Sequence, residues 1–299
     1  MRSKIFRTKS DRIFYIALMA LPVLQFCVFY IYVNINSVIM AFQEYNLTEE
    51  GGVFTFVGLD NFVTLFSGEK LKQLLIMGKN SLILFCFTFF VGIPLALCFS
   101  YYIYKQKALS GLFKVILYLP SILSGVVVGL IYLYFMDQAV PAYYLQFTGE
   151  VMLPPFNDHM LGFSIFYTVF FGFGTNVLLY VGAMGKLSDS VIEAAQIDGA
   201  NSVQEFIYVV LPQIFPTIKT FILTGLAALF TNQASMFTFT SHAPKSESTI
   251  GYYLYVQAKS EEFAVYTELA ALGVALSVIT SAITFTVRHI LNKVDPMEN

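Results

Sequence analysis

The stretch that organises this chain, residues 190–212, reads SVIEAAQIDGANSVQEFIYVVLP. Ser190 and Glu193 have the spacing of a capping box, which predicts that a helix begins here. Gly199 stands where a helix needs a left-handed closing residue, because glycine reaches positive φ without a steric penalty. The first half of the stretch is therefore expected to be a short helix that ends at a hinge.

A second short helix is expected after the hinge. Ser202 and Glu205 repeat the capping-box spacing, and Pro212 indicates where this helix stops or bends. Long hydrophobic runs flank the stretch on both sides, so the chain offers it little soluble domain to pack against. The stretch is a polar island between hydrophobic segments.

The composition indicates a membrane protein. The 299 residues are 57% hydrophobic and only 12% charged, with a mean hydropathy of +0.69. A soluble chain of this length needs more charge to cover its surface, whereas a bilayer is a solvent for apolar side chains. The three cysteines, Cys27, Cys86 and Cys98, lie inside hydrophobic runs and are expected to be small buried hydrophobes, neither disulfide partners nor metal ligands.

Six uncharged or nearly uncharged runs are long enough to cross a ~30 Å hydrocarbon core as helices. They are residues 14–36, 81–104, 115–136, 160–185, 220–240 and 269–287. The first run is too long for the apolar region of a signal peptide, so we expect it to be retained. The predicted fold is an all-α membrane protein with six transmembrane helices. Its parts are an N-terminus (1–13), a first span (14–36), an extracellular loop (37–79), a five-helix core (80–291) and a tail (292–299).

The distribution of basic residues predicts the orientation in the membrane. With the N-terminus inside, the inner segments hold 12 of the 17 Lys and Arg residues, and the outer loops hold 5. Basic residues accumulate on the cytoplasmic side of membrane proteins. Both termini and the stretch 190–212 are therefore expected in the cytoplasm.

Several functional classes lack support in the sequence. No Asp, Glu, Lys, Arg or His lies well inside the six runs, which argues against an ion-coupled carrier, although sodium sites built from carbonyls and hydroxyls would escape this test. A phosphate-binding loop is missing, because Gly185-Lys186 is followed by Leu187 and not by Ser or Thr. The three histidines lie at span ends or in loops. Nothing predicts an enzyme, a bound cofactor or a metal site in this chain.

The stretch 190–212 resembles the EAA loop of the permease subunits of bacterial binding-protein-dependent ABC importers. The residues that match in order and spacing are Glu193, Ala194, Ala195, Asp198, Gly199, Ala200, Phe206, Leu211 and Pro212. Two further segments, Gly58 to Phe62 and Leu119-Pro120, resemble the carbohydrate-importer branch. Within that branch, the chain is similar to the first of two paired permeases, the type found with maltose, oligosaccharide and glycerol-phosphate importers.

The resemblance implies a division of labour in a complex of the bacterial cell membrane. A second, similar permease would complete a pore of the type I importer fold, and an external solute-binding (lipo)protein would deliver a sugar. Two ATP-binding subunits would use ATP and Mg²⁺, and no nucleic acid would take part. The stretch 190–212 would be the coupling helix that docks on one ATPase. The alternative, an amphipathic loop that packs only on its own span ends, stays open.

Candidates for the substrate path are polar or aromatic side chains at membrane depth, because proteins bind sugars through hydrogen bonds and aromatic faces. They are Asn232, Gln233, Asn176 and Tyr132. An alignment with the maltose permease on Leu211-Pro212 also selects Asn232 and adds Gly225 and Leu229. The competing interpretation is structural, since polar residues in spans often bind neighbouring helices.

A secondary carrier or channel of six spans, acting without an ATPase, is the alternative function. It explains the hydropathy equally well. It gives no role, however, to the two short helices predicted in 190–212. A membrane enzyme is less consistent with the sequence, because no catalytic constellation is found.

Overall fold

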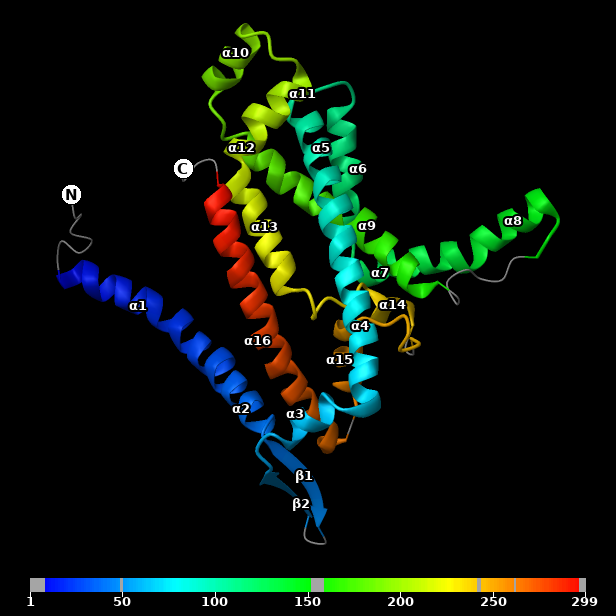
Figure 1. Ribbon diagram of the computed structural model, residues 1–299. Helices are drawn as coiled ribbons and strands as arrows, with labels where there is room; N and C mark the ends of the chain where they lie inside the picture. Colours follow the sequence, from blue (N-terminus) through cyan, green and yellow to red (C-terminus); the bar gives the residue numbers. More distant parts are fainter. Residues whose placement is uncertain (1–8, 49–50, 152–158, 241–242, 261, 296–299) are drawn as a thin grey trace. The chain divides into compact units, whose positions relative to one another are not determined.

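The computed structural model describes residues 9–48, 51–151, 159–240, 243–260 and 262–295, most of which are helical (Figure 1). The chain forms two compact units. The first comprises residues 1–67 with 260–275, and the second comprises residues 68–259 with 276–299. All the candidate functional residues lie in the second unit.

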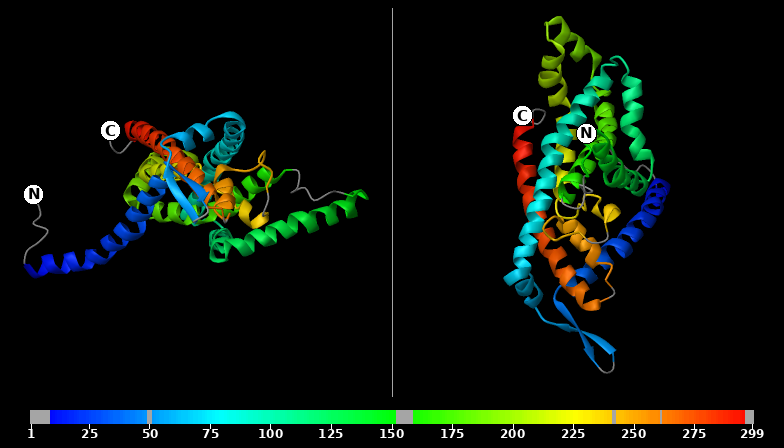
Figure 2. Two further views of the ribbon diagram at one scale, coloured as in Figure 1. Left: turned by 90° about the horizontal axis from the view of Figure 1, so that it is seen from below. Right: turned by 90° about the vertical axis from the view of Figure 1, so that its right-hand side faces the viewer.

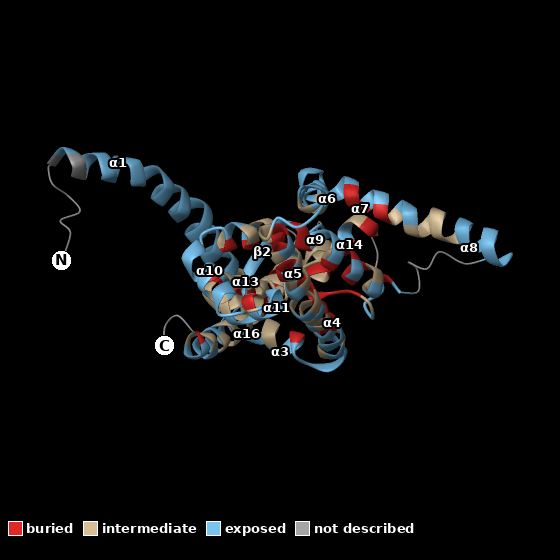
Figure 3. Ribbon diagram, turned by 90° about the horizontal axis from the view of Figure 1, so that it is seen from above, coloured by how far each residue is buried: buried red, intermediate tan, exposed pale blue. Residues whose placement is uncertain are grey.

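The first unit begins with a long apolar helix. It consists of α1 (Lys9–Gln25), the π-helical stretch η1 (Phe26–Tyr32) and α2 (Val33–Met40). Ile13–Met40 is long and apolar enough to cross a membrane, and its apolar window is 0% buried. Figure 3 colours this helix as exposed along nearly its whole length. Such a helix needs lipid as its solvent, and it coincides with the predicted first span, 14–36.

A β-hairpin follows this helix, where only a loop was expected (Figure 2). β1 (Gln43–Thr48) pairs antiparallel with β2 (Gly51–Phe56), and the register sets Tyr45 opposite Phe54. These two rings lie 5.1 Å apart, and aromatic cross-strand pairs stabilise a sheet. The all-α expectation is wrong for this segment, because alternating aromatic and β-branched residues favour strands.

Asn61 lies in the next helix, α3 (Asp60–Leu65), and connects it to the start of the hairpin. Its amide donates hydrogen bonds to the carbonyls of Ala41, at 3.1 Å, and Gln43, at 2.8 Å. Part of the segment 58–62 therefore has a structural role within the first unit.

The second unit is a helical bundle. Its described elements are α4 (Gly68–Phe87), η2 (Thr88–Gly92), α5 (Ile93–Tyr104), α6 (Ser110–Ile122), α7 (Gly125–Tyr134), η3 (Phe135–Ala139), α8 (Val140–Thr148), α9 (Met160–Met184), α10 (Asp189–Ile197), α11 (Ser202–Glu205), η4 (Phe206–Val210), α12 (Leu211–Gln213), α13 (Phe215–Ala227), α14 (Met236–Phe239), α15 (Ile250–Gln257) and the second part of α16 (Phe263–Val294). Both α5 and α6 pack against α9. Figure 1 shows α10 and α11 at the end of the unit where α5 turns into α6.

The predicted third span, 115–136, is broken. Leu123 and Ser124, between α6 and α7, are extended, with ψ of 156° and 128°. The helix long enough to cross a membrane is instead Gly125–Thr148, and it contains Asp137. The expectation that no ionisable residue lies inside a span is therefore wrong for this helix. Hydropathy misses the break because the residues on both sides of it are equally apolar.

The predicted fifth span, 220–240, is wrong in its second half. α13 ends at Ala227, and turns follow it up to α14. Before α13 lies another helical segment, Ser202–Gln213, and the two are bent by 69°. The bend expected at Pro212 is therefore present, two residues further on, at Ile214.

The other predicted spans coincide with long helices. The run 160–185 matches α9, 81–104 lies within Gly68–Tyr104, and 269–287 lies within α16. By length and composition, five of the described helices can cross a membrane, or six if the bent pair counts as one span.

Two clusters of buried side chains hold the second unit together. One joins α4, α7, α9, α14 and α15, and includes Leu84, Tyr132 and Phe239. The other joins α5 and α9 to the stretch 190–212, and buries Ile192 of α10. Since burial of apolar side chains is the main favourable term in packing, α10 is anchored to α5 and α9.

The cysteines are free thiols, so the expectation of no disulfide agrees with the structure. Their predicted burial is wrong, because Cys27 and Cys98 are exposed and Cys86 is only partly buried. Exposed thiols on apolar helices are suited to lipid, which accepts the same side chains as a protein core.

A buried ion pair connects Asp295, in the predicted tail 292–299, to Lys219 of α13. Lys219 Nζ is 2.6 Å from Asp295 Oδ2, and the two side chains are 15% and 1% exposed. This pair connects α13 to the residue that follows α16.

We expect Asp295→Asn to lower the free energy of unfolding by about 3–5 kcal/mol, because the variant removes the charge that compensates the largely buried Lys219 ammonium group in this ion pair. Thermal unfolding in detergent measures the effect. Glu69→Gln is the matched control, since the Glu69–Lys72 pair has side chains 72% and 75% exposed and exposed pairs contribute little. Equal melting temperatures for Asp295→Asn and the wild type would contradict the prediction.

Candidate functional site

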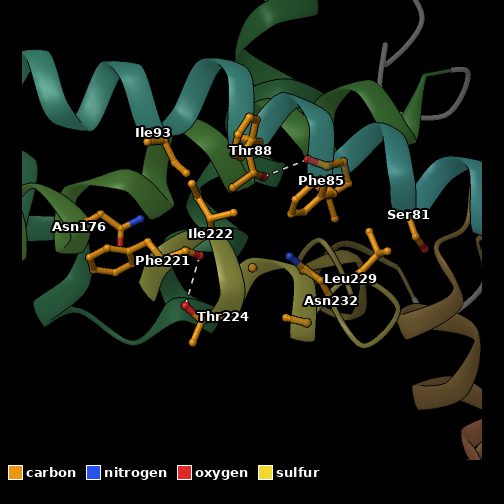
Figure 4. Close-up of a pocket in the computed structure, with 14 residues that line it drawn as sticks. Ser81, Phe85, Thr88, Ile93, Asn176, Phe221, Ile222, Thr224, Leu229 and Asn232 are labelled. Carbon is orange, nitrogen blue, oxygen red and sulfur yellow. Dashed lines mark hydrogen bonds between the residues drawn. The ribbon is translucent and has the colours of Figure 1, made fainter. Parts of the chain in front are cut away.

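A cavity of about 270 Å³ lies among α4, α9 and α13 of the second unit (Figure 4). It brings together four of the six predicted substrate-path residues: Asn176, Gly225, Leu229 and Asn232. Asn176 comes from α9, whereas the other three come from the end of α13 and the turn after it. Residues distant in sequence therefore meet at one site.

The cavity wall is mostly apolar, with three phenyl rings and five polar side chains, and it carries no charged side chain among its lining residues. Its other members are Ser81, Leu84, Phe85, Thr88, Phe89, Ile93, Phe221, Ile222, Thr224 and Ala228. Pockets for small ligands combine apolar and aromatic walls with a few polar groups that fix orientation. This wall has both components.

The residues of α4 and η2 that line the cavity were not predicted from the sequence. Ser81, Phe85 and Thr88 recur at helical spacing, so they share one face of the helix. This periodic polar and aromatic face inside an apolar run was the signal that could have found them. The Thr88 hydroxyl donates to the carbonyl of Leu84 at 3.0 Å, which leaves its oxygen lone pairs for the cavity.

The oxygen and the nitrogen of the Asn232 side-chain amide have different roles. Its Oδ1 accepts a hydrogen bond from the backbone N–H of Ala234 at 2.9 Å. Ala234 and Ser235 both have positive φ, 51° and 56°, so this bond supports a strained turn. Figure 4 shows the amide nitrogen on the side of Phe85, where it can donate to a ligand in the cavity.

The start of α15 holds this turn in place. The hydroxyl of Thr249, a fully buried residue, donates to the carbonyl of Asn232 at 3.1 Å. The Ser81 hydroxyl accepts from the N–H of Ile250 at 3.1 Å. A Cβ on Gly251 would lie only 2.6 Å from backbone atoms of Thr231 and Asn232, so only glycine fits here. These contacts position Asn232.

Two predicted substrate-path residues are not part of the cavity. Gln233 follows Asn232 but does not line the wall. Tyr132 is 5% exposed, and its hydroxyl donates to the carbonyl of Phe163 at 3.1 Å. It belongs to the aromatic core with Tyr167 and Phe239, which is the structural interpretation of a tyrosine within a span.

The stretch 190–212 forms the two short helices that the sequence predicts, α10 and α11, and α11 continues through η4 and α12. Gly199 lies between them with φ of +83°, the left-handed conformation expected at this position. The predicted cap of the first helix is wrong. The N-cap position of α10 is Ser188, two residues earlier than predicted, and no side chain caps the helix. The Ser190 hydroxyl instead pairs with that of Ser188 at 2.7 Å.

The second predicted cap is displaced by one residue. The capping box is formed by Asn201 and Gln204, not by Ser202 and Glu205. Glu205 cannot serve in the cap because its carboxylate is held by Lys105, at 2.7 Å, from the end of α5. The contact that decides between the two caps is therefore tertiary.

The Glu205 carboxylate is buried and ionised. Burial alone would raise its pKa, but hydrogen bonds from Lys105, Gln196 and Tyr101 outweigh burial and hold the pKa below its ordinary value. Glu205 precedes the apolar helix α13, in the loop between the spans. The contact with Lys105 therefore favours the charged form of the Glu205 carboxylate.

The candidate coupling residues divide into an exposed and a packed set. Exposed are Glu193, Ala194, Asp198 and Gly199. Partly buried are Ala195, Ala200, Phe206, Leu211 and Pro212. The ring of Phe206 packs against Tyr101, with centroids 4.7 Å apart. The exposed set is free for a partner, whereas the packed set holds the stretch on its own unit.

Among the described residues, no group of three or more His, Cys, Asp or Glu side chains could hold a metal ion. Both candidate regions lie in the part of the chain that matches known proteins.

Residues 88–296 match the family described as binding-protein-dependent transport system inner membrane component. The match covers more than half of the 299 residues. The chain belongs to this family. This inner membrane component is a multi-pass transport subunit and not an enzyme, in agreement with the resemblance of the stretch 190–212.

The permease is similar to sugar-transport proteins. It is 28% identical over 224 residues to the multiple sugar-binding transport system permease protein MsmF of Streptococcus mutans, covering 73% of this chain and 76% of MsmF. It is 26% identical to the arabinooligosaccharides transport system permease protein AraP of Bacillus subtilis, covering 86% of this chain and 82% of AraP.

A solved structure has the same fold. A chain of a bacterial ABC transporter involved in the import of the acidic polysaccharide alginate matches with a TM-score of 0.78. The match covers 95% of this chain and 96% of that chain at 21% identity. The permease therefore has the fold of an ABC importer membrane subunit.

We expect Gly251→Ala to destabilise the permease by about 1–3 kcal/mol, because the new methyl group overpacks the turn at Thr231 and Asn232. Thermal unfolding in detergent measures this. Gly172→Ala on α9 is the matched control, since a Cβ there meets nothing within 4 Å. If both variants melt at the same temperature, the turn is not packed as tightly as the structure has it.

Proposed function

We propose that this permease is one of two paired membrane subunits that import a sugar or oligosaccharide, driven by ATP hydrolysis on separate subunits. The observation that carries the proposal is the uncharged cavity at Asn176 and Asn232, which sets amides and hydroxyls beside phenyl rings. Such a lining suits a ligand rich in hydroxyl groups. The names of MsmF and AraP, which refer to sugars and arabinooligosaccharides, support the same class of solute.

The lining favours a neutral saccharide over an acidic one. A carboxylate or phosphate that leaves water needs a cationic partner, and the cavity wall offers none. At about 270 Å³, the cavity is at the lower edge of the ~300–1,000 Å³ range of ligand pockets. The second permease is therefore expected to supply the rest of the binding site.

The outer face of α10 is the proposed docking surface for an ATP-binding subunit. Ile197 is 85% exposed, and Glu193 and Ala194 are exposed beside it. Burial of the Ile197 side chain against a partner would be favourable, and Ala194 would let that partner approach closely. ATP and Mg²⁺ belong to the docked subunits, and this chain binds no cofactor in the proposed scheme.

The proposed orientation places both termini and α10 in the cytoplasm, with 12 of 17 basic residues on that side. In this scheme, an external binding protein delivers the solute to the cavity. A related fold was solved in complex with an alginate pentasaccharide-bound periplasmic protein, with a TM-score of 0.77, which supports this assembly.

Transport then follows from two states of the assembled complex. ATP binding closes the ATPase pair, α10 moves with it, and the bundle changes from an inward-facing to an outward-facing state. A ligand shifts such an equilibrium only through different affinities for the two states. The permease supplies the cavity and the lever, and it needs no catalytic group.

We expect Asn232→Asp to lower sugar uptake roughly tenfold, a loss of about 1.4 kcal/mol of binding free energy. The variant keeps the oxygen that accepts from Ala234 but removes the amide donor and adds a charge to the cavity. Uptake into proteoliposomes that contain the complete complex, with a panel of neutral and acidic saccharides, measures the effect.

The control for this variant is Thr175→Ala, because Thr175 is exposed beside Asn176 but does not line the cavity. ATPase activity and complex assembly should be retained in both variants. Wild-type uptake by Asn232→Asp would exclude the cavity as the solute site.

We expect Ala194→Glu and Gly199→Pro to reduce ATP-driven uptake by roughly tenfold or more while membrane insertion is retained, because both change the docking helix and its hinge. Copurification of the ATP-binding subunits and uptake in proteoliposomes measure this. Ser202→Ala is the control, since Ser202 is exposed and the cap uses Asn201 instead. Full uptake by both variants would show that α10 is not the coupling helix.

A further inference from the structure

Glu205 is the most enclosed carboxylate of the loop between α9 and α13, with a side chain only 3% exposed. Lys105 Nζ donates to both carboxylate oxygens, at 2.7 and 3.0 Å. Gln196 Nε2 donates to Oε2 at 3.0 Å, and the Tyr101 hydroxyl donates to Oε1 at 3.0 Å. We call these four residues the Glu205 joint.

The joint connects three helices, of which α10 and α11 are neighbours in the chain, whereas α6 to α9 separate α5 from both. Tyr101 and Lys105 stand four residues apart at the end of α5, Gln196 is on α10, and Glu205 ends α11. The ring of Tyr101 also packs on Phe206, with centroids 4.7 Å apart. Charge-assisted hydrogen bonds in a site shielded from water are the strong class of such bonds.

The Gln196–Glu205 hydrogen bond bridges the hinge at Gly199. Gly199 has φ of +83°, and the backbone hydrogen bond that closes α10 here, from the N–H of Ala200 to the carbonyl of Ala195 at 2.9 Å, ends before α11 begins. A side-chain bond from one helix to the other across this hinge restrains the angle between them. The hinge is therefore closed by a contact that depends on Glu205.

The two faces of α10 have different tasks. Ile192 and Gln196 are four residues apart, so they share a face, and both contact their own unit: Ile192 in the buried cluster and Gln196 at the carboxylate. Glu193, Ala194 and Ile197 lie on the other side and are exposed. A partner can occupy the outer face without disturbing the joint.

The helix that carries Tyr101 also forms the cavity wall. Gly68–Tyr104 is a single helix through α4, η2 and α5. It presents Ser81, Phe85 and Thr88 to the cavity, and its last turn holds the joint. A displacement of that last turn therefore reaches the cavity through continuous helix.

We propose that Glu205 is the positioning residue that fixes α10 to α5, so that a displacement of α10 by a docked subunit moves the cavity wall as one body with it. The proposal rests on the proposed docking function of α10. Without the carboxylate, Ile192 is the remaining buried anchor of α10, so the helix turns about Gly199 more easily and less of the docked subunit's motion reaches the cavity wall.

The test measures the joint directly and through transport. In the assembled complex, with Cys27, Cys86 and Cys98 each changed to Ala, spin labels at Ser190→Cys on α10 and Lys107→Cys after α5 report the distance between the two helices. Both positions are exposed. We expect one narrow distance distribution for the parent protein and a broad one for Glu205→Gln and for Gln196→Ala.

In the same variants without labels, sugar uptake per ATP hydrolysed should fall roughly fivefold or more, the lower limit of common coupling effects. Lys105→Arg should keep the parent value of uptake per ATP hydrolysed, because it keeps a cation beside the carboxylate. Lys105→Met, which removes the cation, should lower this value. Gln196 is exposed, so Gln196→Ala tests the bridge across the hinge even if a change at the buried carboxylate prevents folding.

Lys219→Met is the matched control, since it breaks a buried ion pair of the same unit that does not involve α10. It should lower thermal stability without broadening the distance distribution. A narrow distribution in Glu205→Gln and Gln196→Ala overturns the proposal. The proposal is also overturned if uptake per ATP hydrolysed is unchanged in variants whose distance distribution broadens, provided that Ala194→Glu uncouples uptake from ATP hydrolysis. If Ala194→Glu does not uncouple either, the docking function of α10 is what fails.

Discussion

Every backbone N–H and C=O that enters the hydrocarbon core needs a partner inside the protein, and the rest of this structure depends on that constraint. Helices meet it locally, so α9 and α16 run without interruption for 25 and 32 residues. Their outer side chains can be fully apolar, because lipid replaces water as the solvent. Where a helix stops inside the unit, side chains have to take over the hydrogen bonds.

The turn after α13 is such a place, and it is also where the cavity lies. Thr249 donates to the carbonyl of Asn232, and the Asn232 oxygen accepts from Ala234. The structural and the solute-binding interpretations of Asn232 therefore both apply, to different atoms of one amide. A position that interrupts regular structure exposes polar groups, and the same groups are those that a sugar can use.

The cavity and α10 belong to one mechanical unit because the helix Gly68–Tyr104 reaches both. The middle of this helix was predicted only as an apolar run. The helical spacing of Ser81, Phe85 and Thr88 nevertheless indicates a face that could line a cavity. Four of the six residues predicted for the substrate path line the cavity. Asn176 and Asn232 were selected as polar side chains at membrane depth, whereas Gly225 and Leu229 were selected by the alignment with the maltose permease. Tyr132 does not line the cavity, because hydropathy gives no direction to a side chain on an apolar helix.

The sequence by itself determined the membrane class, the positions of α9 and α16, the hinge at Gly199 and the bend after Pro212. These features depend on local composition and backbone stereochemistry. The tertiary structure alone decided the break at Leu123 and Ser124, the early end of α13 and the partners of Glu205. The reason is physical: a hydropathy window cannot separate lipid from protein as apolar surroundings, and the Lys105–Glu205 contact joins residues 100 positions apart. Because this contact occupies the Glu205 carboxylate, α11 is capped by Asn201 and not by Ser202.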